Sequence, residues 1–517
     1  MLSQRFDVIM GWGVTFQSQG NERDPQNQQN LVLSYQIAIL AQDAKGQWRY
    51  GEDIYHPNTS QAERLTLGQL LWFGLQCVQI GYRSAQGLRI LLVAHNTTAT
   101  WSCLADRETC FRPTGTTIAA SVVTMWPQYY RLRDQHGHGM AVKVSLQDIW
   151  LLAPDSGHGL VIADYAQSIG LPIEDCPSVM YEPCVALAYY VHFMNQYHQA
   201  FGVATVPKTL GEASAKAFVT SLGGAKSAAY YRLFGFEDYE VQWGNRKRMR
   251  KGNVSARRTS AALAADSFHG GMNLTYVFEQ RQCTSDELIL DLDFKGAYST
   301  ALACIPAIDW QQLASVNAQR DQFFPKRIEE IVDRHQDLEK LEYVPPIMGS
   351  IAFAFPSACR HPSLPVSYTT GKFYPLRGST CATGIEMVQA QAMGAEIDLL
   401  TVQAFPIQHD PGTGKPFLVF VEYIRKVNQL RAEYDTGTLP NMLFKEMANS
   451  LYGKSGQGIE EKRRTNFFDV DTAGKPTKKP LPPSEITCPH YAALCTGIVR
   501  TALAAVVAGL DAPFAPG

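Results

Sequence analysis

Apolar runs and amphipathic stretches alternate along the first part of the chain. The apolar runs at residues 31–40, 87–95 and 159–166 predict strands. Residues 66–85 instead repeat apolar positions every three or four residues, which predicts a helix. This rhythm indicates an α/β domain with a central sheet over residues 1–205.

The pattern changes in the second half of the chain. Residues 288–293 form an apolar run that ends on acidic residues, and a helical pattern follows directly. Further strand patterns occupy residues 350–355, 372–378 and 396–405. This part therefore predicts a second sheet that mixes with helices.

Two helical stretches follow these strands, at residues 417–434 and 440–452. Their connection contains Gly437 and Pro440, which suit a tight turn and the first turn of the second helix. We therefore expect an antiparallel helical hairpin.

Length and composition indicate a folded protein of about two to four domains, since the chain has 517 residues, 45% of them hydrophobic and 18% charged. The formal net charge of -2 means that any surface for nucleic acid must be a local patch. Residues 245–258 hold seven basic residues and no acidic one. They form either a solvated loop or a loop that neutralises phosphate.

The cysteines and the longest apolar stretch change the picture little. Eleven cysteines without a C-x-x-C pair predict reduced thiols rather than a zinc site or a disulfide framework. The N-terminus has no signal-peptide pattern, so we expect a cytoplasmic protein, or one in the host cytoplasm if the source is a virus or mobile element. Residues 491–510 approach the length of a membrane span, but Arg500 near their middle predicts a buried helix and no membrane partner.

Two short segments carry candidate chemistry. Asp293 ends the predicted strand, and Tyr298 follows five residues later. Lys445 and Asn449 are one helical turn apart, so they project from one face of the predicted helix. A carboxylate that binds metal ions and a cation that holds phosphates are what phosphoryl transfer requires. An aspartate at a strand-to-helix junction is, however, also typical of a helix N-cap.

The segment "DFKGAYS" resembles motif A of family B DNA polymerases, and "KEMANSLYGK" closely resembles their motif B. The surrounding sequence is most similar to the organellar, viral and plasmid branch, over residues 265–510 and more faintly over the N-terminal third. This resemblance implies an RNase H-like exonuclease-type domain, followed by a partial polymerase palm and a helical-hairpin fingers domain.

The resemblance also implies residue roles. Asp293 would be catalytic and would bind two Mg²⁺ ions with help from the Phe294 carbonyl, and Tyr298 would exclude a ribose 2′-hydroxyl. The expected nucleotide-binding residues are Tyr298, Arg425, Arg431, Lys445, Asn449, Tyr452 and Gly453. "SFHGGM" resembles a template-binding motif and "TGIVR" a primer-terminus motif, so the expected DNA-binding residues are Gly270, Gly271, Thr496 and Arg500, with Arg246, Lys247, Arg248 and Arg250 of the basic segment.

The resemblance breaks at two places. The exonuclease carboxylates would align with Gly13, Thr15, Thr100 and Val185, none of which offers a charged oxygen to a cation. We therefore expect an inactive exonuclease-like domain. The motif C carboxylates, which complete a two-metal site, would follow the helix that ends near residue 510, so we expect a chain truncated before motif C and the thumb.

The predicted division is an exonuclease-like domain at 1–205, a basic linker and template-contacting region at 206–280, the first part of the palm at 281–415, the fingers at 416–455 and a palm helix at 456–517. The expected function is template-directed addition of deoxynucleotides to a primer 3′ end. Its partners would be primer-template DNA, dNTPs and a possible second chain with motif C and the thumb. The alternatives are a non-catalytic DNA-binding remnant or a subunit of a split polymerase, and an active nuclease, against which the missing carboxylates argue.

Overall fold

The chain forms two compact units in the computed structural model. Unit 1 comprises Met1–Ala217, Leu430–Met447 and Glu461–Leu481, and unit 2 comprises Phe218–Gln429, Ala448–Glu460 and Pro482–Gly517. Both units are discontinuous in sequence, and the five predicted domain ranges stay predictions. The structure describes residues 5–19, 29–43, 45–59, 62–80, 87–110, 115–118, 121–124, 128–133, 139–154, 161–171, 180–203, 205–243, 246–273, 293–314, 324–335, 343–368, 371–459, 463–470 and 476–511.

Unit 1 is built on a six-stranded mixed sheet in the order β3-β2-β1-β4-β8-β7. Strands β1, β4 and β8 run parallel to one another, and the other neighbours pair antiparallel. The strands predicted at 31–40 and 87–95 are confirmed as parts of β2 and β4. The bounds are β1 Val8–Gln19, β2 Gln29–Gln42, β3 Trp48–Tyr55, β4 Arg89–Ala94, β7 Gln128–Arg133 and β8 Gly139–Asp148.

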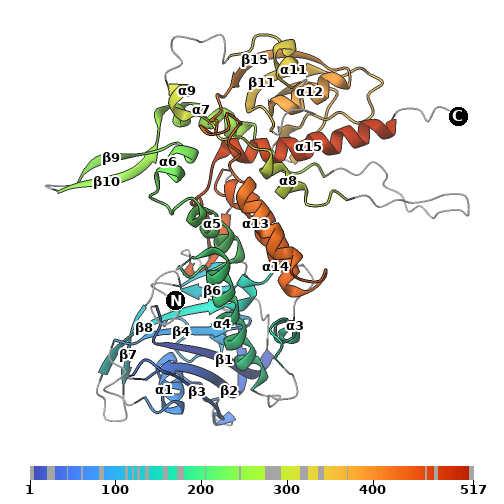
Figure 1. The fold of residues 1–517 in the computed structure, drawn as a ribbon. Helices are drawn as coiled ribbons and strands as arrows, with labels where there is room; N and C mark the ends of the chain where they lie inside the picture. The colour runs from blue at the N-terminus through green and yellow to red at the C-terminus, as the bar shows by residue number, and fades with distance from the viewer. Residues whose placement is uncertain are drawn as a thin grey trace, which may run out of the picture. The chain divides into compact units, whose positions relative to one another are not determined.

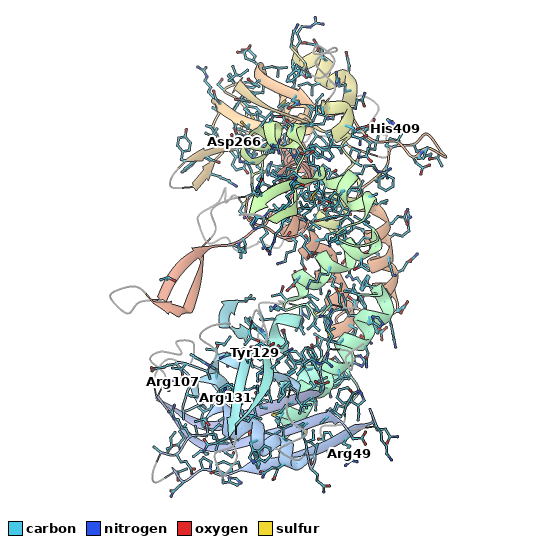
Figure 2. All side chains as sticks on the ribbon, turned by 90° about the vertical axis from the view of Figure 1, so that its left-hand side faces the viewer. Arg49, Arg107, Tyr129, Arg131, Asp266 and His409 are labelled. Carbon is cyan, nitrogen blue, oxygen red and sulfur yellow. The ribbon has the colours of Figure 1, made fainter. Side chains whose placement is uncertain are left out.

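Helices cover both faces of this sheet (Figure 1). The predicted helix is confirmed as α1, Leu67–Cys77, and a capping box of Thr66 and Gln69 fixes its start. Its buried leucines pack against Met10 and Ile37 in the main core of the unit. Alternate residues of β1 point the opposite way, toward α4, Tyr181–Phe201, which packs on β1, β2 and β4.

The prediction of a strand at residues 159–166 is wrong. Residues Ile162–Ser168 form helix α3, because the Asp164 carboxylate accepts a hydrogen bond from the Val161 amide at 2.8 Å and caps the first turn. The other elements of unit 1, or shared with unit 2, are α2 Thr97–Ser102, β5 Gly115–Ile118, β6 Ser121–Thr124, a 3₁₀ turn Ile149–Leu152, α5 Leu210–Ser221, β16 Arg463–Val470 and β17 Pro476–Pro480.

Unit 2 contains a three-stranded antiparallel sheet in the order β14-β11-β15. The strands predicted at 350–355 and 396–405 are confirmed, whereas the one predicted at 372–378 is divided around Pro375, which cannot donate to a ladder. The bounds are β11 Ile347–Ala354, β12 Val366–Tyr368, β13 Gly371–Phe373, β14 Arg377–Thr383 and β15 Glu396–Ala404.

Helices α11, Ile328–His335, and α12, Gly384–Ala392, pack with this sheet in one core cluster. The long helix α15, Pro489–Asp511, contacts α7, α8 and α12. It is long and apolar enough to cross a membrane by composition alone. Its first half is buried in unit 2, however, as predicted for a core helix. The remaining helices are α6 Ala228–Phe234, α7 Ser255–Asp266, α8 Ala297–Ala303 and α9 Trp310–Ala314.

The basic segment is not the loop that its composition suggests. Residues Phe236–Trp243 (β9) and Arg246–Asn253 (β10) pair antiparallel as a hairpin, which extends away from α6 in Figure 1, and Ser255 begins α7. A half-buried strand is recognised in a sequence by its alternating apolar residues. The basic segment has no such alternation, so its sequence does not predict a strand.

The two helices predicted near residues 417–452 are confirmed as α13, Val421–Ala432, and α14, Leu439–Ser455. Pro440 lies in the first turn of α14, where its missing amide hydrogen costs nothing. The buried Asn441 side chain donates hydrogen bonds to the carbonyls of Arg431 and Tyr434, at 3.2 and 3.0 Å, and so fixes the connection.

Candidate functional site

Asp293 lies in unit 2 just before helix α8, with an exposed side chain. The strand predicted before it falls outside the described residues. The N-cap of α8 is Gly296, in the left-handed conformation with φ 65°. Asp293 therefore does not cap this helix, and the alternative role for its carboxylate does not apply. Phe294, the next residue, is also exposed.

The rings of Tyr298 and Tyr452 stack face to face. Their centroids are 4.3 Å apart and their planes are 7° from parallel. Tyr298 comes from the segment that resembles motif A, and Tyr452 from the segment that resembles motif B. Unit 2 thus brings together two residues that sequence analysis assigned to the same nucleotide. Partial burial raises the pKa of Tyr298, so the phenol is neutral at physiological pH.

The glycine-rich segment at residues 267–272 lies against the same pair. A Cβ atom on Gly271 would be 3.1 Å from the Tyr298 hydroxyl oxygen, so only a residue without a side chain allows this approach at no cost. A Cβ atom on Gly456, just after motif B, would be 2.8 Å from the Phe268 ring. The backbone of the glycine-rich segment therefore packs on the Tyr298 side chain, and the backbone just after motif B packs on the Phe268 ring.

Arg500 of α15 holds this glycine-rich segment in place. Its guanidinium is 1% exposed and pairs with Glu386 of α12 at 2.8 Å. It also donates hydrogen bonds to the carbonyls of His269 and Gly270, at 2.6 and 2.9 Å. His269 Nε2 lies 2.8 Å from the Cys381 carbonyl oxygen. The segment is thus tied to α12, α15 and β14 by buried polar contacts.

Burial alone would raise the pKa of Glu386. The positive charge of Arg500 and hydrogen bonds from Thr383 outweigh burial, so the pKa of this carboxyl lies below its ordinary value. Burial, followed by the charge of Arg500, lowers the pKa of His269. At neutral pH the network therefore contains one ionised acid, one arginine and a neutral imidazole.

Thr496 and Arg500, which are predicted to bind DNA, have contacts inside the protein in this structure. Both are buried, and the Thr496 hydroxyl donates to carbonyls of its own helix. Neither side chain is accessible to a DNA strand in this structure. Arg500 holds the backbone of Gly270, and a DNA-binding role for Thr496 and Arg500 stays a prediction.

The other predicted nucleotide-binding residues lie on α13 and α14. Arg425 is exposed and paired with Glu422, whereas the Arg431 side chain donates to Asn441 at 3.3 Å. Lys445 and Gly453 are exposed, and a Cβ atom on Gly453 would meet open space. Lys445 belongs to unit 1 and Asn449, Tyr452 and Gly453 to unit 2. The convergence of Lys445 and Asp293 on one nucleotide stays a prediction.

Three of the four positions that align with exonuclease carboxylates carry other interactions in unit 1. The Thr15 hydroxyl accepts a hydrogen bond from Gln36 at 2.9 Å, and the Thr100 hydroxyl donates to the Thr97 carbonyl at 3.2 Å. Val185 is fully buried. These side chains serve the packing of the unit.

The fourth position, Gly13, marks a close approach of β1 to α4. A Cβ atom on Gly13 would be 3.2 Å from the Pro183 ring, and one on Gly11 would collide with the Pro183 carbonyl oxygen. The carboxylate of Glu182 lies 3.6 Å from the same point above Gly13. Burial, and then the charge of Asp148, raise the pKa of Glu182 to about 7. Helix α4 therefore occupies the space above β1.

Among the residues that the structure describes, no three His, Cys, Asp or Glu side chains are grouped to hold a metal ion. The exposed Asp293 carboxylate suits one hard cation such as Mg²⁺, but a two-metal site needs further oxygen donors. The fit of the described residues to a two-metal centre is thus partial.

Comparison with known structures defines the class of fold. Phi29 DNA polymerase, complexed with primer-template DNA and incoming nucleotide substrates, aligns with a TM-score of 0.55 at 10% identity, over 98% of this chain and 78% of that chain. Its orthorhombic crystal form aligns with a TM-score of 0.52 over the same shares. The mixed α/β multidomain fold is therefore similar to that of this DNA polymerase.

A curated sequence relative is the primer-independent DNA polymerase PolB of Escherichia coli. It is 23% identical over 525 residues, which cover 92% of this chain and 56% of PolB. The chain thus spans about half the length of this relative. No protein-family model matches the sequence.

Two features of unit 2 are not apparent from the sequence. One is Glu386, the buried partner of Arg500, which is 114 residues away in sequence. A buried arginine without a partner would strongly destabilise the fold, so the sequence implies that an acidic residue pairs with Arg500. It does not show which acidic residue this is. The other is the β9–β10 hairpin, whose basic composition resembles a loop.

Proposed function

We propose that this chain functions in template-directed DNA synthesis, as all or part of a family B DNA-directed DNA polymerase. The observation that supports this best is the stack of Tyr298 on Tyr452 beside Gly271. Three segments that resemble polymerase motifs, far apart in sequence, meet at these residues. The resemblance to PolB over 92% of the chain supports the same function.

In this proposal Asp293 and the Phe294 carbonyl hold one side of a Mg²⁺ site. Bound Mg²⁺ would neutralise phosphate oxygens and lower the pKa of the primer 3′-hydroxyl. Tyr298 would pack beneath the sugar of the incoming dNTP, with Tyr452 fixing the plane of its ring. Lys445 would contact the triphosphate, Asn449 and Tyr452 would shape the pocket for the new base pair, and Gly453 would let the backbone approach that pocket.

The remaining metal ligands must come from residues outside those already assigned. We propose that a segment equivalent to the rest of PolB supplies a second carboxylate, in the same polypeptide or in a partner chain. The competing proposal is a DNA-binding protein without catalysis. It predicts DNA binding that is independent of Asp293 and no primer extension under any condition.

Replacing Tyr298 by alanine tests the proposed function through sugar selection. We expect discrimination between dNTPs and ribonucleotides to fall about 10- to 200-fold, since a steric pocket of this kind contributes 1–3 kcal/mol. Single-nucleotide primer extension by the complete polymerase measures the ratio of kcat/KM values.

Tyr298→Phe is the matched control, because it keeps the ring and should keep discrimination. Tyr452→Leu removes the stack without opening the space beneath the sugar. It should therefore slow the incorporation of dNTPs and of ribonucleotides by similar factors. Equal discrimination by wild type and Tyr298→Ala would contradict the role of Tyr298.

We further propose that residues 1–205, within unit 1, form an RNase H-like exonuclease domain that has lost its nuclease activity. The strand order and the replaced carboxylates at Gly13, Thr15, Thr100 and Val185 support this. The protein should therefore leave a mismatched primer 3′ end intact in Mg²⁺ without nucleotides. The proposal would be refuted if the protein released the labelled terminal nucleotide in a Mg²⁺-dependent reaction, and if this activity remained after the protein had been purified again.

A further inference from the structure

The two faces of the β9–β10 hairpin differ sharply in charge. In an antiparallel ladder, paired residues project to the same face and successive residues to opposite faces. Lys247, Met249 and Lys251 of β10 pair with Gln242, Glu240 and Asp238 of β9. Lysine and acidic residues therefore share this face, which we call the paired face.

Charges on the paired face are largely compensated. Lys247 forms an ion pair with Glu240 at 2.9 Å. Lys251 lies over the Phe236 ring, 4.2 Å from its centroid, and donates to the Tyr230 hydroxyl at 3.1 Å. Tyr231 donates a hydrogen bond to Asp238 at 2.8 Å. These contacts fix the base of the hairpin and leave little net charge for a ligand.

The opposite face carries arginine and an aromatic ring. Arg250 pairs directly with Tyr239, and Arg248 with Val241. We call this the arginine face. Both arginines are exposed, and Tyr239 is 46% exposed. Among the described residues of the hairpin, the acid on this face is Glu237 at the base, 3.8 Å from Arg258.

Gly252 supports the Tyr239 ring from below. A Cβ atom on Gly252 would be 2.5 Å from Tyr239 Cε1, so the ring lies directly on the backbone of the neighbouring strand. One side of the ring is thus held by the hairpin, and the exposed part remains available to a flat ligand. Two guanidinium groups on the same face lie on the adjacent strand.

We propose that the arginine face of this hairpin binds single-stranded DNA, with a base stacked on Tyr239 and phosphates at Arg248 and Arg250. Proteins that bind single-stranded DNA combine basic side chains along the backbone of the strand with aromatic rings, because the bases of a single strand are free to stack. Duplex DNA presents its phosphates but keeps its bases in the helix, so it would use the arginines without Tyr239. This site would add a DNA contact to the proposed polymerase. The inference rests on the proposed polymerase function only for where the single strand comes from.

Equilibrium binding without Mg²⁺ or nucleotides tests the proposal. Fluorescence anisotropy would compare a labelled oligo(dT) with a duplex of equal length, each over a range of salt concentrations. Tyr239→Leu should weaken binding of the single strand about 5- to 150-fold and leave duplex binding within about twofold. Tyr239→Phe, which keeps the ring, should bind like wild type.

Charge variants on the two faces complete the test. Arg248→Gln with Arg250→Gln should reduce the salt slope for the single strand by about 1.4, or 0.7 per phosphate contact. Lys247→Gln removes one positive charge on the paired face and should alter affinity much less, because Glu240 already compensates that charge. Unchanged single-strand binding by Tyr239→Leu, equal loss for both DNAs, or a loss of affinity for Lys247→Gln as large as that for the double arginine variant would overturn the proposal.

This result is separable from the proposed enzyme function. Asp293→Asn should bind oligo(dT) like wild type, whether or not the protein extends primers. Absence of primer extension by the wild-type protein, with intact single-strand binding, would count against the polymerase proposal alone.

Discussion

Replacing Asp293 by asparagine is expected to lower primer extension about 10²- to 10³-fold. A carboxylate that holds a catalytic cation contributes several kcal/mol of transition-state stabilisation, and each 1.4 kcal/mol is tenfold in rate. Asparagine keeps the size of the side chain but removes its charge. The exposed position of Asp293 before α8 means that folding should be unaffected. The measurement is single-turnover extension in Mg²⁺ by the complete polymerase.

Asp398→Asn is the matched control, since Asp398 is an exposed aspartate on β15 of the same unit. It should extend primers at the wild-type rate. If Asp293→Asn extends primers as fast as this control, the assignment of Asp293 as a metal ligand is wrong.

Replacing Glu386 by alanine is expected to lower the free energy of unfolding of unit 2 by about 3–5 kcal/mol, because it leaves the charge of Arg500 buried without a partner. The pair is 1% and 2% exposed, so solvent cannot compensate. Denaturant unfolding followed by a probe in unit 2 measures the change. Since the pKa of Glu386 is lowered in the folded state, its contribution is present above the ordinary glutamate pKa of about 4.3 and is lost as pH falls below that value.

The exposed pair of Arg327 and Glu330, 3.4 Å apart, supplies the control. Glu330→Ala should cost at most about 1 kcal/mol, because exposed ion pairs contribute little. The double variant Glu386→Leu with Arg500→Met should recover most of the loss, since it removes both buried charges. A loss for Glu386→Ala no larger than that for Glu330→Ala would show that the buried pair does not stabilise the unit.

Local patterns predicted most elements that have an apolar alternation or a helical period. The strands at 350–355 and 396–405 and the helix α14 belong to this group, because their burial depends on one face only. Residues 159–166 look equally apolar, but a hydrogen bond from Val161 to Asp164 starts a helix there. Such a local bond competes with strand formation, and periodicity does not reveal it.

Sequence motifs single out the candidate residues of the site, but they do not predict most of the contacts of these residues. Asp293, Tyr298 and Tyr452 stand out because of their spacing within motifs. That Tyr298 stacks on Tyr452 depends on how distant segments fold, and no local pattern specifies it. Arg500 shows the same limit, because its motif suggested DNA as the partner, whereas Glu386 and two backbone carbonyls satisfy it.

The glycines of β1 make the proposed loss of nuclease chemistry hard to reverse. An aspartate introduced at position 13 would meet the Pro183 ring before it could reach a cation. Regaining a cation site would thus require the first turn of α4 to retreat while carboxylates appeared on at least two other elements. A carboxylate at position 13 alone would therefore not restore a cation site.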